Sequence, residues 1–178
     1  LVLMAPFTSV TAQTSAGLRP MSFLDVQNMA RVGSWAPSLD GRWMLYTVTT
    51  PDWQEAEEQS DIHLVSMQEG MSSNRQMTFT EDKNEKSPEW LKNSNAFVFL
   101  SNRDGEKDQL YLMRPDGGEA QRITDMEEGI STFSFSDDGH WLVYRSGKLN
   151  REQLYLLPVD GIVDAESDRL TDGKVGVK

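Results

Sequence analysis

Two stretches of the sequence share one pattern: Pro37-Ser38-Leu39-Asp40-Gly41-Arg42-Trp43-Met44-Leu45-Tyr46 and Phe135-Ser136-Asp137-Asp138-Gly139-His140-Trp141-Leu142-Val143-Tyr144. Each joins an Asp-Gly dipeptide, which favours a tight hairpin turn with positive φ at both residues, to an aromatic and apolar run, which favours a β-strand. Leu91–Phe99 is a weaker copy, with Asn93-Ser94 in place of Asp-Gly. One supersecondary unit therefore occurs three times.

Two further signals keep the same register. A second strand-like run follows each first one, at Asp61–Val65, Gln109–Met113 and Gln153–Leu157. A closing segment ends in a threonine each time, and Thr78, Thr124 and Thr171 lie 46 and 47 residues apart. A four-stranded unit of roughly this length fits a β-propeller blade, for which about 40–45 residues are usual, whereas a β-sandwich would not explain the register.

The repeat predicts an all-β chain, a partial β-propeller of about three four-stranded antiparallel blades at residues 34–80, 81–126 and 127–173. Propellers close with about four to eight blades, so we expect residues 34–178 to be a fragment of a larger propeller. Its two outer blades would each present an uncovered apolar face.

The residues before the blades predict a leader. Residues 1–12 resemble the latter half of a secretory signal peptide, with an apolar run followed by small residues before a cut after Ala12. Residues 13–33 follow as a leader. Within it, Ser22-Phe23-Leu24-Asp25 is a capping-box pattern that predicts a short helix from Ser22 to about Ala30, with Gly33 as a stop and an apolar face that packs against the segment after it.

Charge and composition exclude several classes of function. The 178 residues carry 17 Lys+Arg against 28 Asp+Glu, a net charge of −11, and no two basic residues are adjacent. A nucleic acid or an anionic membrane surface is therefore not expected as a partner. The absence of cysteine excludes disulfides, cysteine-based zinc sites and thiol catalysis.

The blade pattern resembles that of TolB-type propellers and of the propeller of the prolyl oligopeptidase family of serine peptidases, particularly its dipeptidyl-peptidase and acylaminoacyl-peptidase branches. Two stretches sharpen the likeness to the peptidases, Arg31-Val32-Gly33 and Tyr46–Asp52, and Ser101–Gly105 is likewise typical. The resemblance spans about Ser22 to Gly173. It implies a full-length enzyme in which a C-terminal α/β-hydrolase domain cleaves short peptides and the propeller restricts their access.

The chain itself lacks that chemistry. The family's nucleophile lies in a G-x-S-x-G elbow, which is absent; the nearest approach, Gly129–Phe133, lacks the second glycine and lies where an inner blade strand is expected. His63 occupies the position of Tyr111 and Tyr155 and is expected to pack, whereas His140 lies in a turn and is expected to be solvated. We therefore predict no catalytic, cofactor-binding or metal-binding residues and no cofactor.

Three other sets of residues could be taken for binding sites. The acidic stretch Asp52–Asp61 is expected to be a solvated loop. Asn102, Asp104 and Asp108 lack the spacing of a calcium loop and suit a hairpin turn better. Three tryptophans are also candidates, namely Trp43, Trp90 and Trp141. The equivalent positions of Trp43 and Trp141 predict packing between blades instead of ligand stacking, with a cost of about 3–5 kcal/mol for Trp141→Ala in a folded propeller.

The leading hypothesis is a non-catalytic propeller segment of a secreted or periplasmic serine peptidase. Its partners would be the C-terminal hydrolase domain of the same protein and the peptide substrates of the full enzyme, with no nucleic acid and no membrane after signal removal. The alternative is a TolB-like periplasmic propeller that serves protein–protein interaction. A short leader favours the peptidase, because TolB carries a sizeable domain before its propeller.

Overall fold

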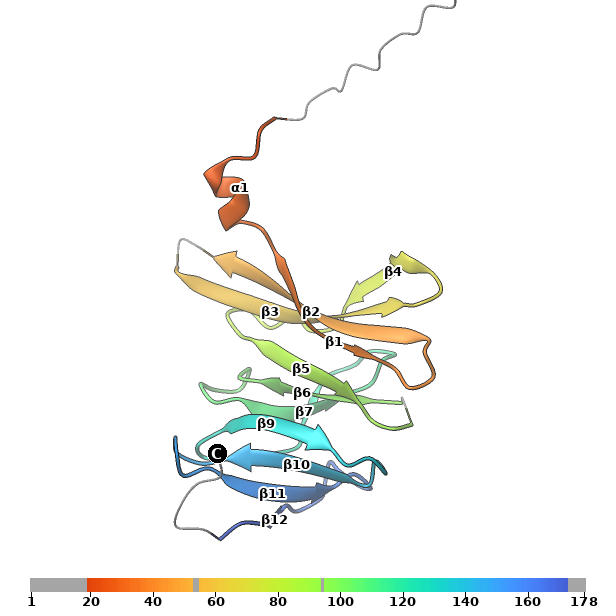
Figure 1. The fold of residues 1–178 in the computed structure, drawn as a ribbon, viewed down its shortest axis with the longest axis vertical. Coiled ribbons are helices and arrows are strands. Elements are labelled where there is room, and N and C mark those ends of the chain that lie inside the picture. The colour runs from red at the N-terminus through yellow and green to blue at the C-terminus, as the bar shows by residue number, and fades with distance from the viewer. Residues whose placement is uncertain (1–18, 53–54, 94, 173–178) are drawn as a thin grey trace, which may run out of the picture.

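The computed structural model describes residues 19–52, 55–93 and 95–172, and within them the chain forms one short helix and three antiparallel sheets (Figure 1). The expected signal remnant at residues 1–12 lies outside the described residues. Within the described residues, no helix is long and apolar enough to cross a membrane.

Each sheet contains four strands that pair in the order of the chain. The first sheet comprises β1 (Arg31–Pro37), β2 (Trp43–Asp52), β3 (Glu57–Ser66) and β4 (Gly70–Gln76). The second comprises β5 (Glu85–Trp90), β6 (Phe97–Ser101), β7 (Gln109–Met113) and β8 (Gln121–Arg122). The third comprises β9 (Ile130–Phe135), β10 (Trp141–Ser146), β11 (Gln153–Pro158) and β12 (Asp168–Arg169). The predicted all-β class with three four-stranded units is confirmed.

The turns after β1 and β9 share one hydrogen-bond pattern, but not the expected backbone. Ser38 Oγ donates to Asp40 Oδ1 at 2.6 Å and accepts from the Trp43 amide at 2.9 Å. Only the glycines have positive φ, 68° at Gly41 and 74° at Gly139, so the prediction of positive φ at both Asp and Gly was wrong. Aspartate instead acts as a hydrogen-bond acceptor, which lowers the pKa of Asp40 to about 2.

The closing threonines hold the last segment of each sheet against its third strand. The hydroxyl of Thr124 accepts from the Leu110 amide at 2.9 Å and donates to Gln109 Oε1 at 3.0 Å. Thr78 makes the same two contacts with Ile62 and Asp61, as does Thr171 with Leu154 and Gln153. The threonine recurs at this spacing because it forms the same pair of hydrogen bonds in each sheet. We call this pair the threonine clip; it aligns the closing segment with the third strand.

The sheets stack face to face around two apolar clusters. Leu45 of the first sheet and Phe97 and Phe99 of the second are fully buried in the cluster that joins these sheets. Val98 and Leu142 are fully buried in the cluster that joins the second and third sheets. Neighbouring side chains of β6 therefore enter opposite clusters, as the two-residue period of a strand requires.

The helix departs from expectation in length and packing. The capping box is present, since Ser22 Oγ accepts from the Asp25 amide and the Ser22 amide donates to the Asp25 carboxylate. However, α1 spans only Phe23–Gln27, and Gly33 lies inside β1 instead of stopping a helix. No residue of α1 is buried, and Phe23 is 75% exposed. The predicted packing was wrong because α1 stands beyond the first sheet, with no described segment against its apolar face (Figure 1).

The first sheet begins at Arg31, earlier than the expected boundary at Ser34. Gly33 is needed there for close approach, because a Cβ at this position would lie 2.6 Å from Thr47 Oγ1 in β2. The sequence suggested that Gly33 stops the helix. In the structure Gly33 instead allows β1 to approach Thr47 of β2 closely.

Candidate functional site

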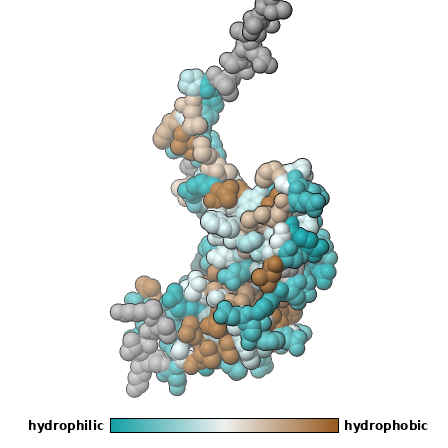
Figure 2. All heavy atoms as spheres, turned by 45° about the vertical axis from the view of Figure 1, so that its right-hand side comes forward, coloured by the Kyte–Doolittle hydropathy of each residue, from teal (hydrophilic) through white to brown (hydrophobic). Residues whose placement is uncertain are grey.

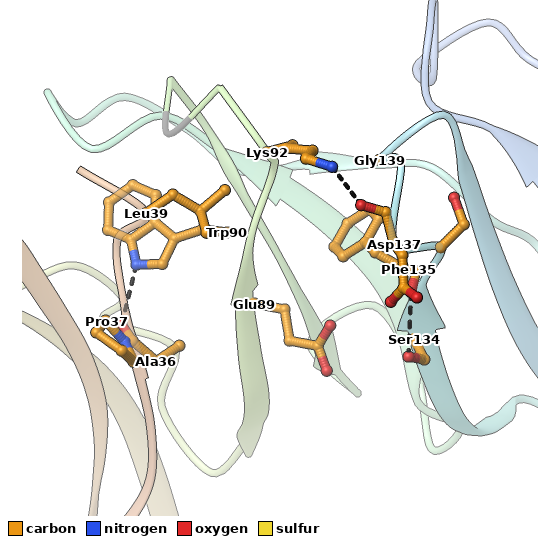
Figure 3. A pocket seen from close by; sticks show the side chains of 11 residues that line it. Ala36, Pro37, Leu39, Glu89, Trp90, Lys92, Ser134, Phe135, Asp137 and Gly139 are labelled. Atoms are coloured by element: carbon orange, nitrogen blue, oxygen red, sulfur yellow. Dashed lines mark hydrogen bonds between the residues drawn. The ribbon is translucent and has the colours of Figure 1, made fainter. Parts of the chain in front are cut away.

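The first strands of the three sheets, β1, β5 and β9, end around a shared pocket of about 320 Å³ (Figure 3). Its walls come from the three strand ends and the turns that follow them. The lining residues are Ala36, Pro37, Leu39, Glu89, Trp90, Lys92, Ser134, Phe135, Ser136, Asp137 and Gly139. The pocket is thus built by residues about 45 to 53 positions apart, which the repeat brings together.

Hydrogen bonds between neighbouring sheets fix the walls of this pocket. Trp90 Nε1 donates to the Ala36 carbonyl at 2.9 Å, which links β5 to β1. Lys92 Nζ donates to the Asp137 carbonyl, which links the second sheet to the turn after β9 (Figure 3). Gly139 permits this approach, because a Cβ there would lie 2.7 Å from the Lys92 side chain.

A bulge in β5 determines where the side chains around it point. The strand register shifts between Lys86 and Glu89, where Ser87 has a φ of 50° and Pro88 lacks an amide proton. Beyond the bulge, Glu89 pairs with Val98 and Trp90 with Phe97. Glu89 therefore shares the face of Val98, toward the third sheet, and Trp90 shares the face of Phe97, toward the first.

Glu89 is the chemically distinctive residue of the pocket. Its side chain extends between the Ala36–Pro37 wall and the Ser134–Phe135 wall (Figure 3). It is half-buried, and its carboxylate has no hydrogen bond or ion pair with any residue in the described ranges. Burial raises its pKa above the ordinary glutamate value, because the charged form loses hydration. The site thus holds an acceptor group to which none of the described residues donates.

The sequence predicted no functional residue here, and it did not single out Glu89. The available signal was a charged residue between Pro88 and Trp90, at the end of a strand. Charged side chains at strand ends are ordinarily solvated. Glu89 stands out only because the two neighbouring sheets partly enclose it.

Both histidines lie as predicted. His63 stacks on Tyr46 with ring centroids 5.4 Å apart, and the equivalent pairs Phe99–Tyr111 and Tyr144–Tyr155 stack in the same way. His140 is exposed in its turn. Ser131 lies in a blade strand, β9, and its Oγ accepts from Arg145 Nε at 3.0 Å.

The acidic stretch differs from its expected form. Asp52 pairs with Glu57 across β2 and β3, so most of the stretch is a long hairpin instead of a loop. Glu58 is exposed and forms an ion pair with Arg31. Asp61 is buried, accepting from Gln59 Nε2 and Thr78 Oγ1, so solvation was the wrong prediction for this residue. Its position in the threonine clip explains the burial.

The candidate calcium ligands each have a protein partner. Asn102 Oδ1 accepts from the Asn84 amide at 2.8 Å, Asp104 Oδ2 from the Tyr111 hydroxyl at 2.7 Å, and Asp108 pairs with Lys86 at 2.9 Å. Across the described part of the chain, no three His, Cys, Asp or Glu side chains are grouped to hold a metal ion.

The tryptophans divide into two kinds. Trp90 is buried, and Trp43 packs against the cluster between the first two sheets, so inter-blade packing is confirmed for Trp43. Trp141 is 41% exposed, and the same prediction was wrong for it in this chain. By register it faces away from the second sheet, where no described sheet covers it. Apolar side chains gather over this end of the molecule (Figure 2).

Comparisons with known proteins agree with this architecture. No protein-family model matches the chain. It is 28% identical over 137 residues to dipeptidyl-peptidase 5 of Porphyromonas endodontalis, covering 77% of this chain and 19% of the relative. It is 32% identical over 130 residues to dipeptidyl-peptidase 5 of Porphyromonas gingivalis, covering 73% and 18%. The chain thus spans about a fifth of the length of these relatives.

Three solved structures show the same fold. The putative TolB from Agrobacterium tumefaciens matches with a TM-score of 0.57 at 25% identity, over 80% of this chain and 47% of that one. Dipeptidyl peptidase 4 of Porphyromonas gingivalis matches with a TM-score of 0.63 at 12% identity, over 85% and 28%. The β-propeller domain of the Trilobed protease from Pyrococcus furiosus gives 0.59 at 11% identity, over 80% and 43%.

The three sheets are therefore blades of a β-propeller of the kind found in prolyl oligopeptidase-family peptidases and in TolB. More particularly, the homologues of this chain include dipeptidyl-peptidase 5 and the uncharacterized peptidase YuxL of Bacillus subtilis, to which it is 38% identical over 58 residues, 33% of this chain and 9% of that protein. The resemblance seen in the blade motifs is confirmed.

Proposed function

We propose that this chain is a non-catalytic propeller segment of a serine peptidase of the prolyl oligopeptidase family. In this role it limits the access of peptides to an α/β-hydrolase domain of the same full-length protein. The likeness to dipeptidyl-peptidase 5 over 137 residues carries the proposal, because those residues are only 19% of the relative. The sequence of the segment contains no G-x-S-x-G elbow, which supports a non-catalytic role for it.

The proposal includes the division of the chain and its location. Residues 1–12 are the remnant of a secretory signal, residues 13–33 a leader whose last three residues already begin β1, and residues 34–178 part of a larger propeller. The protein would then act in the periplasm or outside the cell. The complete lack of cysteine is compatible with such an oxidising compartment.

A second candidate is a TolB-like propeller that binds other proteins and has no catalytic domain. The 25% identity to the putative TolB from Agrobacterium tumefaciens, over 80% of this chain, favours it. Propellers support both kinds of function, because the fold presents loops and a central channel on which different sites are built.

An activity assay on the full-length protein separates the two candidates. The peptidase proposal predicts hydrolysis of a dipeptidyl chromogenic substrate, labelling by a serine-directed fluorophosphonate, and no cleavage of a tightly folded protein. The isolated 178-residue chain is the matched control and should neither hydrolyse nor label. A full-length protein that is not labelled and does not hydrolyse peptides would overturn the proposal in favour of the binding module.

A further inference from the structure

The pocket between β1, β5 and β9 has a composition suited to one kind of ligand. We propose that it binds a long basic side chain, lysine or arginine, of a peptide. The Glu89 carboxylate would accept hydrogen bonds from the cationic group, while Phe135 packs against the aliphatic stem. Only the assumption that the ligand is a peptide rests on the proposed function.

The charge of the pocket favours a cation. Glu89 has no donor among the described residues, and a half-buried carboxylate without a partner is stabilised by an incoming ammonium or guanidinium group. Asp137 also lines the pocket, whereas Lys92 is the basic residue in the lining, and its ammonium group already donates to the Asp137 carbonyl. The net charge of −11 raises the local concentration of cations around the chain.

The walls favour a side chain that is apolar along most of its length. Pro37, Leu39, Trp90 and Phe135 contribute apolar surface around Glu89. Lysine and arginine bury their methylene stems on such surfaces, and their charged groups interact favourably with aromatic rings. A volume of about 320 Å³ lies at the small end of ligand pockets, which suits one side chain rather than a folded peptide.

The position of the pocket suits a peptide that passes through the propeller toward the proposed hydrolase domain. It is formed where three successive first strands end, so a bound side chain would contact all three sheets at once. The two inter-sheet bonds, from Trp90 to Ala36 and from Lys92 to Asp137, hold the walls whether or not Glu89 is charged. Glu89 is therefore free to act on a ligand without supporting the fold.

Binding of blocked peptides to the full-length protein tests the proposal. Acetyl-Ala-Lys-Ala-amide and acetyl-Ala-Arg-Ala-amide should bind, as measured by isothermal titration calorimetry after fluorophosphonate treatment. The norleucine analogue should bind at least about tenfold more weakly, since it keeps the stem but lacks the charge. A free-amine Ala-norleucine-Ala-amide distinguishes a side-chain cation from a peptide amino terminus.

Two variants assign the effect to Glu89. Glu89→Gln is nearly isosteric and breaks no bond within the described residues, so its melting temperature should not fall. It should weaken binding of the lysine and arginine peptides about tenfold or more. Glu55→Gln, an exposed carboxylate distant in the sequence, is the matched control and should leave binding unchanged.

Three results would overturn the inference: no binding of the basic peptides, equal binding by Glu89→Gln, or binding of the free-amine peptide alone. Its failure remains distinguishable from failure of the proposed function. If the full-length protein hydrolyses peptides but binds them equally well without the Glu89 carboxylate, only this inference is contradicted. If binding depends on Glu89 but no peptide is hydrolysed, only the proposed peptidase function is contradicted.

Discussion

The junction between the first two sheets and the outer face of the third sheet contain the same residue type at the same strand position. Trp43 and Trp141 each begin the second strand of their sheet. Trp43 packs against a cluster that includes buried Trp90 and Phe97, whereas Trp141 is 41% exposed. The difference teaches that a blade motif places an aromatic side chain on a face, but a neighbouring sheet decides whether that face is buried.

The largest effect is expected at the covered junction. Trp90→Ala should lower the free energy of unfolding by about 3–5 kcal/mol, because it leaves a cavity between the first two sheets and removes the bond to the Ala36 carbonyl. Urea unfolding followed by circular dichroism measures this loss. A loss below about 1 kcal/mol would show that the two sheets do not depend on each other in the way the packing indicates.

An intermediate effect is expected within a single sheet. Thr124→Val should cost about 1–3 kcal/mol, because the buried Leu110 amide and Gln109 amide oxygen both lose a partner. The matched control is Thr132→Val, an exposed threonine in β9, which should change the same urea midpoint little. Equal losses for the two variants would contradict the role of the closing threonine.

The smallest effect is expected at the uncovered face. Trp141→Ala should lower the stability of this chain by about 1 kcal/mol or less, since much of the ring is already hydrated. In a longer protein with another blade over this face, the same change should cost about 3–5 kcal/mol. Comparing urea midpoints for the two proteins tests the difference. A large loss in the shorter chain would mean that Trp141 is already supported within it.

Local features of the fold were predictable from the sequence because they depend on near neighbours. The strands after Asp40-Gly41 and Asp138-Gly139, the capping box at Ser22 and the stacking position of His63 follow from turn chemistry and two-residue periodicity. The register of Thr78, Thr124 and Thr171 predicted three sheets for the same reason: successive antiparallel strands pair through short connections.

Only the tertiary structure decided which of these side chains are buried away from solvent. The sequence placed Asp61 among solvated carboxylates, but the threonine clip buries it. The sequence also predicted packing for the capped helix α1, none of whose residues is buried by the described part of the chain. Trp43 and Trp141 cannot be told apart by their local motif. Glu89 gains its distinct character from pocket residues of the two neighbouring sheets, about 45 to 53 positions away in the sequence. Burial and pKa depend on contacts between sheets, and no pattern within one repeat encodes whether the next sheet is there.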